Sequence, residues 1–237
     1  MKFIENTLLN GQVTVKQPEN GYRTAIDPIM LAAACHPHPD DHIVDLGCGV
    51  GTIGLCLNHF DPGMNVTGYE IQPELAEIAG QNLKGDNFKI LNESIDKVEK
   101  NTFHVAVMNP PYYEDGQNIS SPDISKATAH SGVLENWFKA ANTGLRKGGY
   151  LYGILPAIRF DDVIKLSRKH QFGALQFYPL FPKLDKPAKR IIFQARKHKS
   201  GQTVLHSGLV LHRQERNYTD EAAAILNGET KIKAFLK

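Results

Sequence analysis

Short apolar runs alternate with amphipathic segments along most of the chain. The runs have the length of buried strands, and the segments between them carry apolar residues at helical spacing. Strands that alternate with helices form a parallel sheet that is covered on both faces. We therefore expect an α/β fold. The expected strands are 43–46, 66–70, 88–91, 103–108 and 150–155, and the expected helices are 52–60, 73–83, 134–145 and 157–170.

The pattern changes at both ends of this series. Residues 3–17 alternate weakly around Asn10-Gly11, which predicts a β-hairpin. Asp27-Pro28 predicts a helix N-cap followed by proline at the first helical position. Apolar runs at 175–180 and 190–195 follow each other without a helix, so they should pair antiparallel. We expect one domain over 1–237, with 1–36 as an N-terminal hairpin and helix cap, a further strand at 203–213, and a C-terminal helix from Thr219.

The strand at 103–108 runs directly into Asn109-Pro110-Pro111-Tyr112. The two prolines have no backbone N–H for a strand ladder, so the sheet must release the chain at Asn109. An amide, two fixed backbone turns and an aromatic ring therefore follow the carboxyl end of a strand. Ligands bind along that edge in open α/β sheets.

A glycine-rich turn, Gly47-Cys48-Gly49-Val50-Gly51, joins the strand at 43–46 to its helix. Glycines there let the backbone turn sharply and approach a ligand closely. Glu70 ends the next strand, where a carboxylate accepts hydrogen bonds from ribose hydroxyls. Residues 49–54 also fit a dinucleotide pattern, so this segment alone does not separate NAD from S-adenosylmethionine. Asp45 favours the second, because a carboxylate opposes a pyrophosphate and suits a cationic sulfonium ligand.

The pattern Asp-x-Gly-x-Gly-x-Gly at 45–51 resembles the first motif of class I S-adenosylmethionine-dependent methyltransferases. The resemblance implies their Rossmann-like fold, a mostly parallel seven-stranded sheet with an antiparallel last strand and helices on both faces. It also implies S-adenosylmethionine as cofactor. Ser94 falls where this fold usually places a polar group on the adenine ring. The implied cofactor residues along the sheet edge are Asp45, Gly47, Gly49, Glu70, Ile71, Ser94 and Asn109.

Asn109-Pro110-Pro111-Tyr112 resembles the catalytic motif of methyltransferases that act on adenine, cytosine or glutamine amide nitrogen. The resemblance implies Asn109, Pro110 and Tyr112 as catalytic residues. The Asn109 side-chain oxygen and the Pro110 carbonyl would each accept one N–H of a planar amine, which points the nitrogen lone pair at the methyl group. Tyr112 would stack on the base, which is worth ~1–3 kcal/mol. The substrate contacts expected nearby are Pro111, Tyr112 and His130.

Residues 21–28 resemble the N-terminal signature of the bacterial adenine-N6 methyltransferases that modify a valine tRNA next to its anticodon. Two positions depart from the usual Tyr-Arg-Phe-Ser-Ile-Asp. Tyr22 and Arg23 would cover the cofactor. Tyr218-Thr219-Asp220-Glu221 is similar to the Tyr-Thr-x-Glu near the end of the same family. The resemblance implies N6 of a tRNA adenine as the methylated atom.

Seven Lys/Arg residues and one Asp lie between Lys183 and Lys199, in and around the hairpin that joins the last strands. Phosphates bind such basic patches, although a charge run can also be a solvated surface. An RNA substrate is therefore expected. The expected contacts are Lys183, Lys186, Lys189 and Arg190.

Composition narrows the remaining choices. A net charge of +2 indicates no partner by itself, and no apolar run approaches the ~20 residues that span a bilayer, so we expect no membrane association. The three cysteines include no Cys-x-x-Cys pair, which favours a reducing, cytoplasmic location. The ten histidines form no ligand pair at metal-site spacing, so we expect no metal. A monomer is favoured.

Four alternatives stay open. One is a protein-glutamine N5 methyltransferase, which the short N-terminal region disfavours because those enzymes carry a separate helical domain there. Another is an amino-methyltransferase for a different rRNA or DNA base. The third is a nicotinamide oxidoreductase that uses the same glycine turn. The last is a non-catalytic RNA-binding module that keeps the fold.

Overall fold

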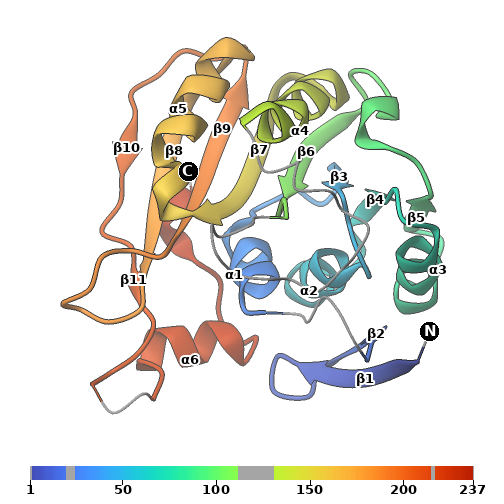
Figure 1. Ribbon diagram of the computed structural model, residues 1–237, viewed down its shortest axis with the longest axis horizontal. Coiled ribbons are helices and arrows are strands. Elements are labelled where there is room, and N and C mark those ends of the chain that lie inside the picture. Colours follow the sequence, from blue (N-terminus) through green and yellow to red (C-terminus); the bar gives the residue numbers. More distant parts are fainter. Residues whose placement is uncertain (1, 20–24, 112–130, 215–216, 237) are drawn as a thin grey trace.

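A nine-stranded sheet forms the centre of the computed structural model, which describes residues 2–19, 25–111, 131–214 and 217–236. The strands follow the order β10-β8-β9-β7-β6-β3-β4-β5, and β11 also pairs with β8 (Figure 1). Strand β9 is antiparallel to both β7 and β8, whereas the other pairs of this sheet are parallel. The strands are β3 (His42–Leu46), β4 (Asn65–Tyr69), β5 (Phe88–Leu91), β6 (Phe103–Met108), β7 (Leu145–Pro156), β8 (Phe172–Phe181), β9 (Arg190–Lys197), β10 (Val204–Leu205) and β11 (Leu209–Val210).

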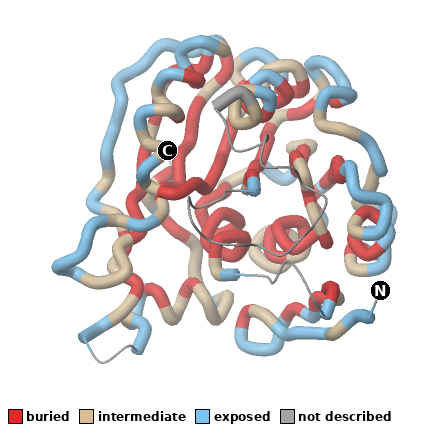
Figure 2. The backbone as a smooth tube through the Cα atoms, in the orientation of Figure 1, coloured by how far each residue is buried: buried red, intermediate tan, exposed pale blue. Residues whose placement is uncertain are grey.

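Helices cover both faces of the sheet (Figure 1). Helices α4 and α5 pack on one face over a core that includes Phe138, Phe177 and Phe193. Helices α1, α2 and α6 pack on the other. Because both faces are covered, the central strands are buried along nearly their whole length (Figure 2). The helices are α1 (Asp27–Ala34), α2 (Thr52–Phe60), α3 (Pro73–Asn82), α4 (Ser131–Gly144), α5 (Phe160–Lys169) and α6 (Asp220–Leu226), with short 3-10 turns η1 (Ile95–Lys97), η3 (Ala157–Arg159) and η4 (Lys233–Phe235).

The N-terminal hairpin forms as expected from Asn10-Gly11. Strands β1 (Phe3–Leu8) and β2 (Val13–Pro18) pair antiparallel, and Asn10 and Gly11 both adopt positive φ in the turn. The hairpin is attached to the end of α3, where Asn82 accepts a hydrogen bond from the Lys16 backbone at 2.9 Å. It lies along the side of the molecule below α2 and α3 (Figure 1).

The predicted α/β class and mostly parallel sheet are confirmed, and three details are wrong. The expected strand at 203–213 is two separate two-residue strands, so the sheet has nine strands and not seven. Helix α4 ends at Gly144 and β7 begins at Leu145, five residues before the strand expected at 150–155, because Leu145 already pairs with Phe103 of β6. Asp27 is not an N-cap: it lies inside the first turn of α1, and Ile26 occupies the cap position.

The strand order reverses beside β3, because β4 follows β3 along the chain on one side and β6 lies on the other. Ligands bind at the carboxyl ends of parallel strands at such a switch point. We call this edge of the sheet the site edge. Among the described residues, no helix is long and apolar enough to cross a membrane.

Candidate active site

Strand register brings three predicted site residues to the site edge. Leu46 of β3 pairs with Tyr69 of β4 on one side and with Met108 of β6 on the other. The residues that follow these partners are Gly47, Glu70 and Asn109. All three therefore leave neighbouring strands at the same level.

The glycine turn presents open backbone at this edge. Gly47 and Gly49 have φ of +62° and +56°, a backbone conformation that residues other than glycine rarely adopt. A Cβ on Gly47 would lie 2.3 Å from the Trp137 ring of α4, so the turn packs directly on that helix. A Cβ on Gly49 would meet nothing within 4 Å. The backbone at Gly49 is therefore accessible to a ligand.

Glu70 fastens the glycine turn to the end of β4. Its Oε2 accepts a hydrogen bond from the Gly49 N–H at 2.9 Å, and its Oε1 accepts one from Gln72 at 2.8 Å. The side chain of Asn92, directly after β5, donates to the backbone carbonyls of Glu70 and Ile71 at 2.9 and 3.2 Å. Sequence reasoning missed Asn92, although an asparagine immediately after a strand at this edge is a usable signal.

Asp45 is the most distinctive group of the site. Its carboxylate is fully buried, and within the described part of the chain neither oxygen has a hydrogen-bond partner. Burial, reinforced by the nearby charge of Glu70, raises the pKa of Asp45 well above its usual value. A buried carboxylate of this kind is stabilised by a cation. S-adenosylmethionine carries a cationic sulfonium and a cationic amino group, so the residues present fit this cofactor.

Two further predicted cofactor contacts differ in their surroundings. Ile71, just past Glu70, keeps 67% of its surface exposed, which leaves an apolar face for a flat ring. Ser94 instead caps the turn η1, where its hydroxyl accepts a hydrogen bond from the Asp96 N–H at 3.3 Å. Contact of either residue with the cofactor stays a prediction.

Asn109, Pro110 and Pro111 leave β6 at the site edge. Asn109 is half-buried, Pro110 is buried and Pro111 is exposed. The chain therefore rises out of the sheet over this segment, as the two prolines require. The predicted residues Tyr22, Arg23, Tyr112 and His130 lie outside the described residues.

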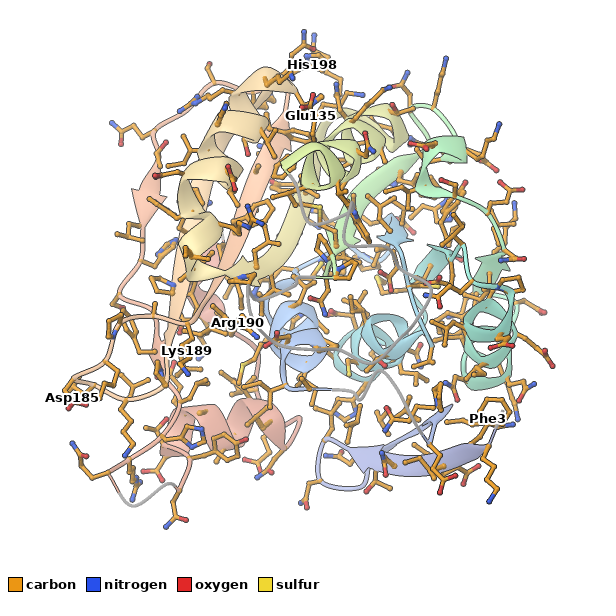
Figure 3. All side chains as sticks on the ribbon, in the orientation of Figure 1. Phe3, Glu135, Asp185, Lys189, Arg190 and His198 are labelled. Atoms are coloured by element: carbon orange, nitrogen blue, oxygen red, sulfur yellow. The ribbon has the colours of Figure 1, made fainter. Side chains whose placement is uncertain are left out.

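The basic run is divided between two ends of the molecule. Strand β9 runs antiparallel to β7, so Arg190 pairs with Pro156 near the site edge, whereas Arg196 pairs with Tyr150 at the opposite edge. Figure 3 shows Arg190 and His198 at the two ends of β9. Lys197 is buried and donates to the Leu145 carbonyl at 2.6 Å, which is a structural role. Only the residues from 183 to 190 remain as candidates for substrate contact.

Arg190 has an internal partner that sequence reasoning missed. Its Nε donates to Oδ2 of Asp27 at 2.9 Å, and the Asp27 side chain is only 8% exposed. The pair joins the first turn of α1 to the start of β9 at the site edge. Substrate contact by Lys183, Lys186, Lys189 and Arg190 stays a prediction, and Arg190 additionally positions α1.

Strand order, glycine turn and buried carboxylate together define a class I S-adenosylmethionine-dependent methyltransferase. Among the described residues, no group of three or more His, Cys, Asp or Glu side chains could hold a metal ion. The family model "Methyltransferase small domain" matches residues 28–159, more than half of the chain. The chain belongs to this family, and S-adenosylmethionine is its cofactor.

Similar proteins extend the comparison over most of the chain. Several relatives carry the name tRNA1(Val) (adenine(37)-N6)-methyltransferase. The relative from Vibrio campbellii is 25% identical over 219 residues, which is 89% of each chain. The relative from Pedobacter heparinus is 24% identical and covers 94% of this chain and 97% of its own length. A crystal structure of a predicted O-methyltransferase from Agrobacterium tumefaciens shares the fold, with a TM-score of 0.73, 22% identity, and coverage of 87% of this chain and 98% of that chain.

Proposed function

We propose that this protein methylates the N6 amine of adenine in tRNA, at a position next to the anticodon of a valine tRNA. The observation that carries the proposal is the register of β3 and β6. Together with the register of β3 and β4, it puts the Asn109-Pro110 segment level with the glycine turn and Glu70, which supports an amine acceptor beside the proposed cofactor residues. The names of relatives that align over most of the chain support RNA adenine as the substrate.

The chain's own groups account for the activation of a weak nucleophile. The lone pair of an exocyclic amine is delocalised into its ring. In this proposal the Asn109 side-chain oxygen accepts one N–H and the Pro110 carbonyl accepts the other. The two hydrogen bonds draw the nitrogen toward a tetrahedral geometry and point its lone pair at the methyl group. Pro110 is buried at the end of β6, and positioning of two acceptors around the amine lowers the barrier without a strong base.

Asp45, Glu70 and the backbone of Gly49 hold the cofactor in this account. When bound, S-adenosylmethionine supplies an electrophilic methyl group. The buried Asp45 carboxylate would hold its cationic part, while Glu70 and the exposed Ile71 would contact its adenosine part. Tyr112 would provide the stacking face for the substrate base.

The proposal is tested by methyl transfer to total tRNA. The tRNA comes from a strain in which this gene is deleted, and S-adenosylmethionine carries a labelled methyl group. Nuclease digestion followed by mass spectrometry identifies the product nucleoside. N6-methyladenosine is expected. Recovery of label in methylated cytidine or guanosine, or in no nucleoside at all, contradicts the proposal.

A further inference from the structure

A pocket of about 330 Å³ opens beside the β8–β9 hairpin, away from the methyl-transfer residues. Hairpin residues Lys183 and Leu184 line one side, and residues from β11 and the segment after it, including His212 and Arg213, line the other. Strand β11 pairs with the end of β8 at the outer edge of the sheet. It therefore lies four strand spacings from β6, or about 19 Å from the level of Asn109. The methyl-transfer account uses none of these residues except Lys183.

A stacked aromatic pair stands beside this pocket. The rings of His212 and Tyr218 have centroids 4.7 Å apart and planes 22° apart. A short antiparallel ladder fixes them: the Arg213 N–H donates to the Asn217 carbonyl at 2.8 Å and the Thr219 N–H donates to the Leu211 carbonyl at 2.9 Å. Tyr218 nevertheless keeps 40% of its surface exposed. A partly exposed aromatic ring on a fixed backbone is a stacking platform for an unpaired base.

Two cationic side chains, Lys183 and Arg213, line the pocket. The Lys183 ammonium donates to the Gln214 carbonyl at 3.1 Å, which holds it over the pocket. The Arg213 guanidinium bonds to Asp220 at 2.5 Å and still has a side chain that is 56% exposed. Lys186 is 60% exposed and lies 3.9 Å from Asp185. The two acids offset part of the positive charge, but an apolar pocket with stacked rings and cations at its rim fits a nucleotide better than a purely apolar or anionic ligand.

We propose that this pocket, which we call the anchor pocket, together with the adjoining ring of Tyr218 binds one unpaired nucleotide of the RNA substrate. Tyr218 does not itself line the pocket but stacks on His212, which does. In the proposal the base stacks on the exposed Tyr218 ring, and its phosphate is attracted by Lys183 and Arg213, which line the pocket. This inference rests on the proposed function, because it takes RNA as the substrate. A nucleotide bound about 19 Å along the sheet from Asn109 fixes the position of the RNA on the protein surface. It thereby determines which adenine reaches the active site.

The test measures binding of a valine tRNA transcript by the full-length protein. Tyr218→Leu removes the ring and keeps apolar bulk. It should raise both the Kd for the transcript and the KM in methyl transfer about tenfold, with kcat and S-adenosylmethionine affinity unchanged. Tyr218→Phe keeps the stacking face and should bind like the wild type. Lys183→Ala should lower the slope of log K against log salt by about one unit.

Matched control variants come from the far side of the molecule. Phe3 is 41% exposed, nearly equal to Tyr218, and lies at the opposite side of the molecule from Asp185 of the hairpin (Figure 3). Phe3→Leu and Lys84→Ala, an exposed lysine beside β5, should leave tRNA binding and its salt slope unchanged. If Tyr218→Leu binds tRNA as tightly as Phe3→Leu does, the anchor pocket is refuted.

Binding and methyl transfer separate this inference from the proposed function. If the wild type methylates the transcript and Tyr218→Leu binds the transcript as tightly as the wild type, only the anchor proposal is refuted. Wild type that binds the transcript through Tyr218 and methylates no RNA refutes the proposed function and supports the anchor. Absence of tRNA binding by the wild type refutes both.

Discussion

Replacing Asp45 by Asn should strengthen the fold and weaken the cofactor site. The substitution keeps the shape of the side chain and removes its charge. Asp45 is fully buried, and neither of its oxygens has a partner among the described residues. In the free protein its charge is therefore a cost to stability. In the proposed complex with S-adenosylmethionine, the same charge would face a cation.

The two effects have different sizes. Leaving a buried polar group unsatisfied costs about 1–3 kcal/mol, and a charge costs more. The variant should therefore raise the free energy of unfolding by about 1–3 kcal/mol at neutral pH. For a chain of this size that corresponds to an increase in Tm of about 2–12 °C. Loss of a hydrogen bond to a charged group, about 1.5–3 kcal/mol, should raise the Kd for S-adenosylmethionine about 10- to 150-fold.

The difference in free energy of unfolding between Asp45→Asn and the wild type should also increase as the pH rises. Burial raises the folded-state pKa of Asp45 above that of the unfolded chain. Below the unfolded pKa both states carry the proton, and this contribution to stability is fully present. As the pH rises through the folded pKa, the unfolded state binds fewer protons than the folded one, and that stability is lost. The wild type should therefore lose stability with rising pH over this window, and Asp45→Asn should not.

Thermal melts over a pH series and calorimetric titration with S-adenosylmethionine measure both effects. The gap in Tm between Asp45→Asn and wild type should widen as the pH rises, and saturating cofactor should narrow it by stabilising the wild type more. A variant that is less stable than the wild type at neutral pH and binds S-adenosylmethionine equally well would refute the assignment of Asp45 as the partner of a cationic ligand.

Three further substitutions have distinct expected results. Asn109→Ala should lower kcat for methyl transfer about 10²–10³-fold, measured by label incorporation, and leave the calorimetric Kd for S-adenosylmethionine unchanged, because it removes one acceptor from the amine. Glu70→Gln weakens the bond to Gly49 and should raise that Kd about tenfold with little change in kcat, so an unchanged Kd speaks against the role of Glu70. Arg190→Met removes the guanidinium that bonds to the buried Asp27 and should lower the free energy of unfolding by about 1–3 kcal/mol in chemical denaturation; Asp27→Asn combined with it should recover part of that loss.

The local sequence pattern was sufficient to predict the bounds of a helix or strand where a single apolar run forms a single element. Thr52–Phe60, Phe88–Leu91 and Phe103–Met108 form elements at the bounds expected from their apolar periodicity. The prolines after Met108 and the glycines after Leu46 end their strands for local steric reasons. Because parallel strands place their carboxyl ends together, these two endings sufficed to predict that the glycine turn and Asn109 share one edge.

Long-range pairing explains the errors. Asp27 followed by proline has the local form of a helix cap, but its partner is Arg190, 163 residues away. The basic run looks continuous in the sequence, yet an extended β9 separates Arg190 from Lys197 by about 24 Å. Leu145 belongs to β7 because Phe103 offers it a ladder position, which overrides the helical spacing that precedes it.

In the proposed reaction, the Asn109-Pro110 segment presents the N6 amine of one tRNA adenine to the methyl donor. The most direct measurement compares two valine tRNA transcripts that differ only in the base next to the anticodon, adenine in one and guanine in the other. Label from S-adenosylmethionine should enter the first transcript as N6-methyladenosine and should not enter the second. Equal incorporation into both transcripts, or incorporation into neither, would contradict the claim.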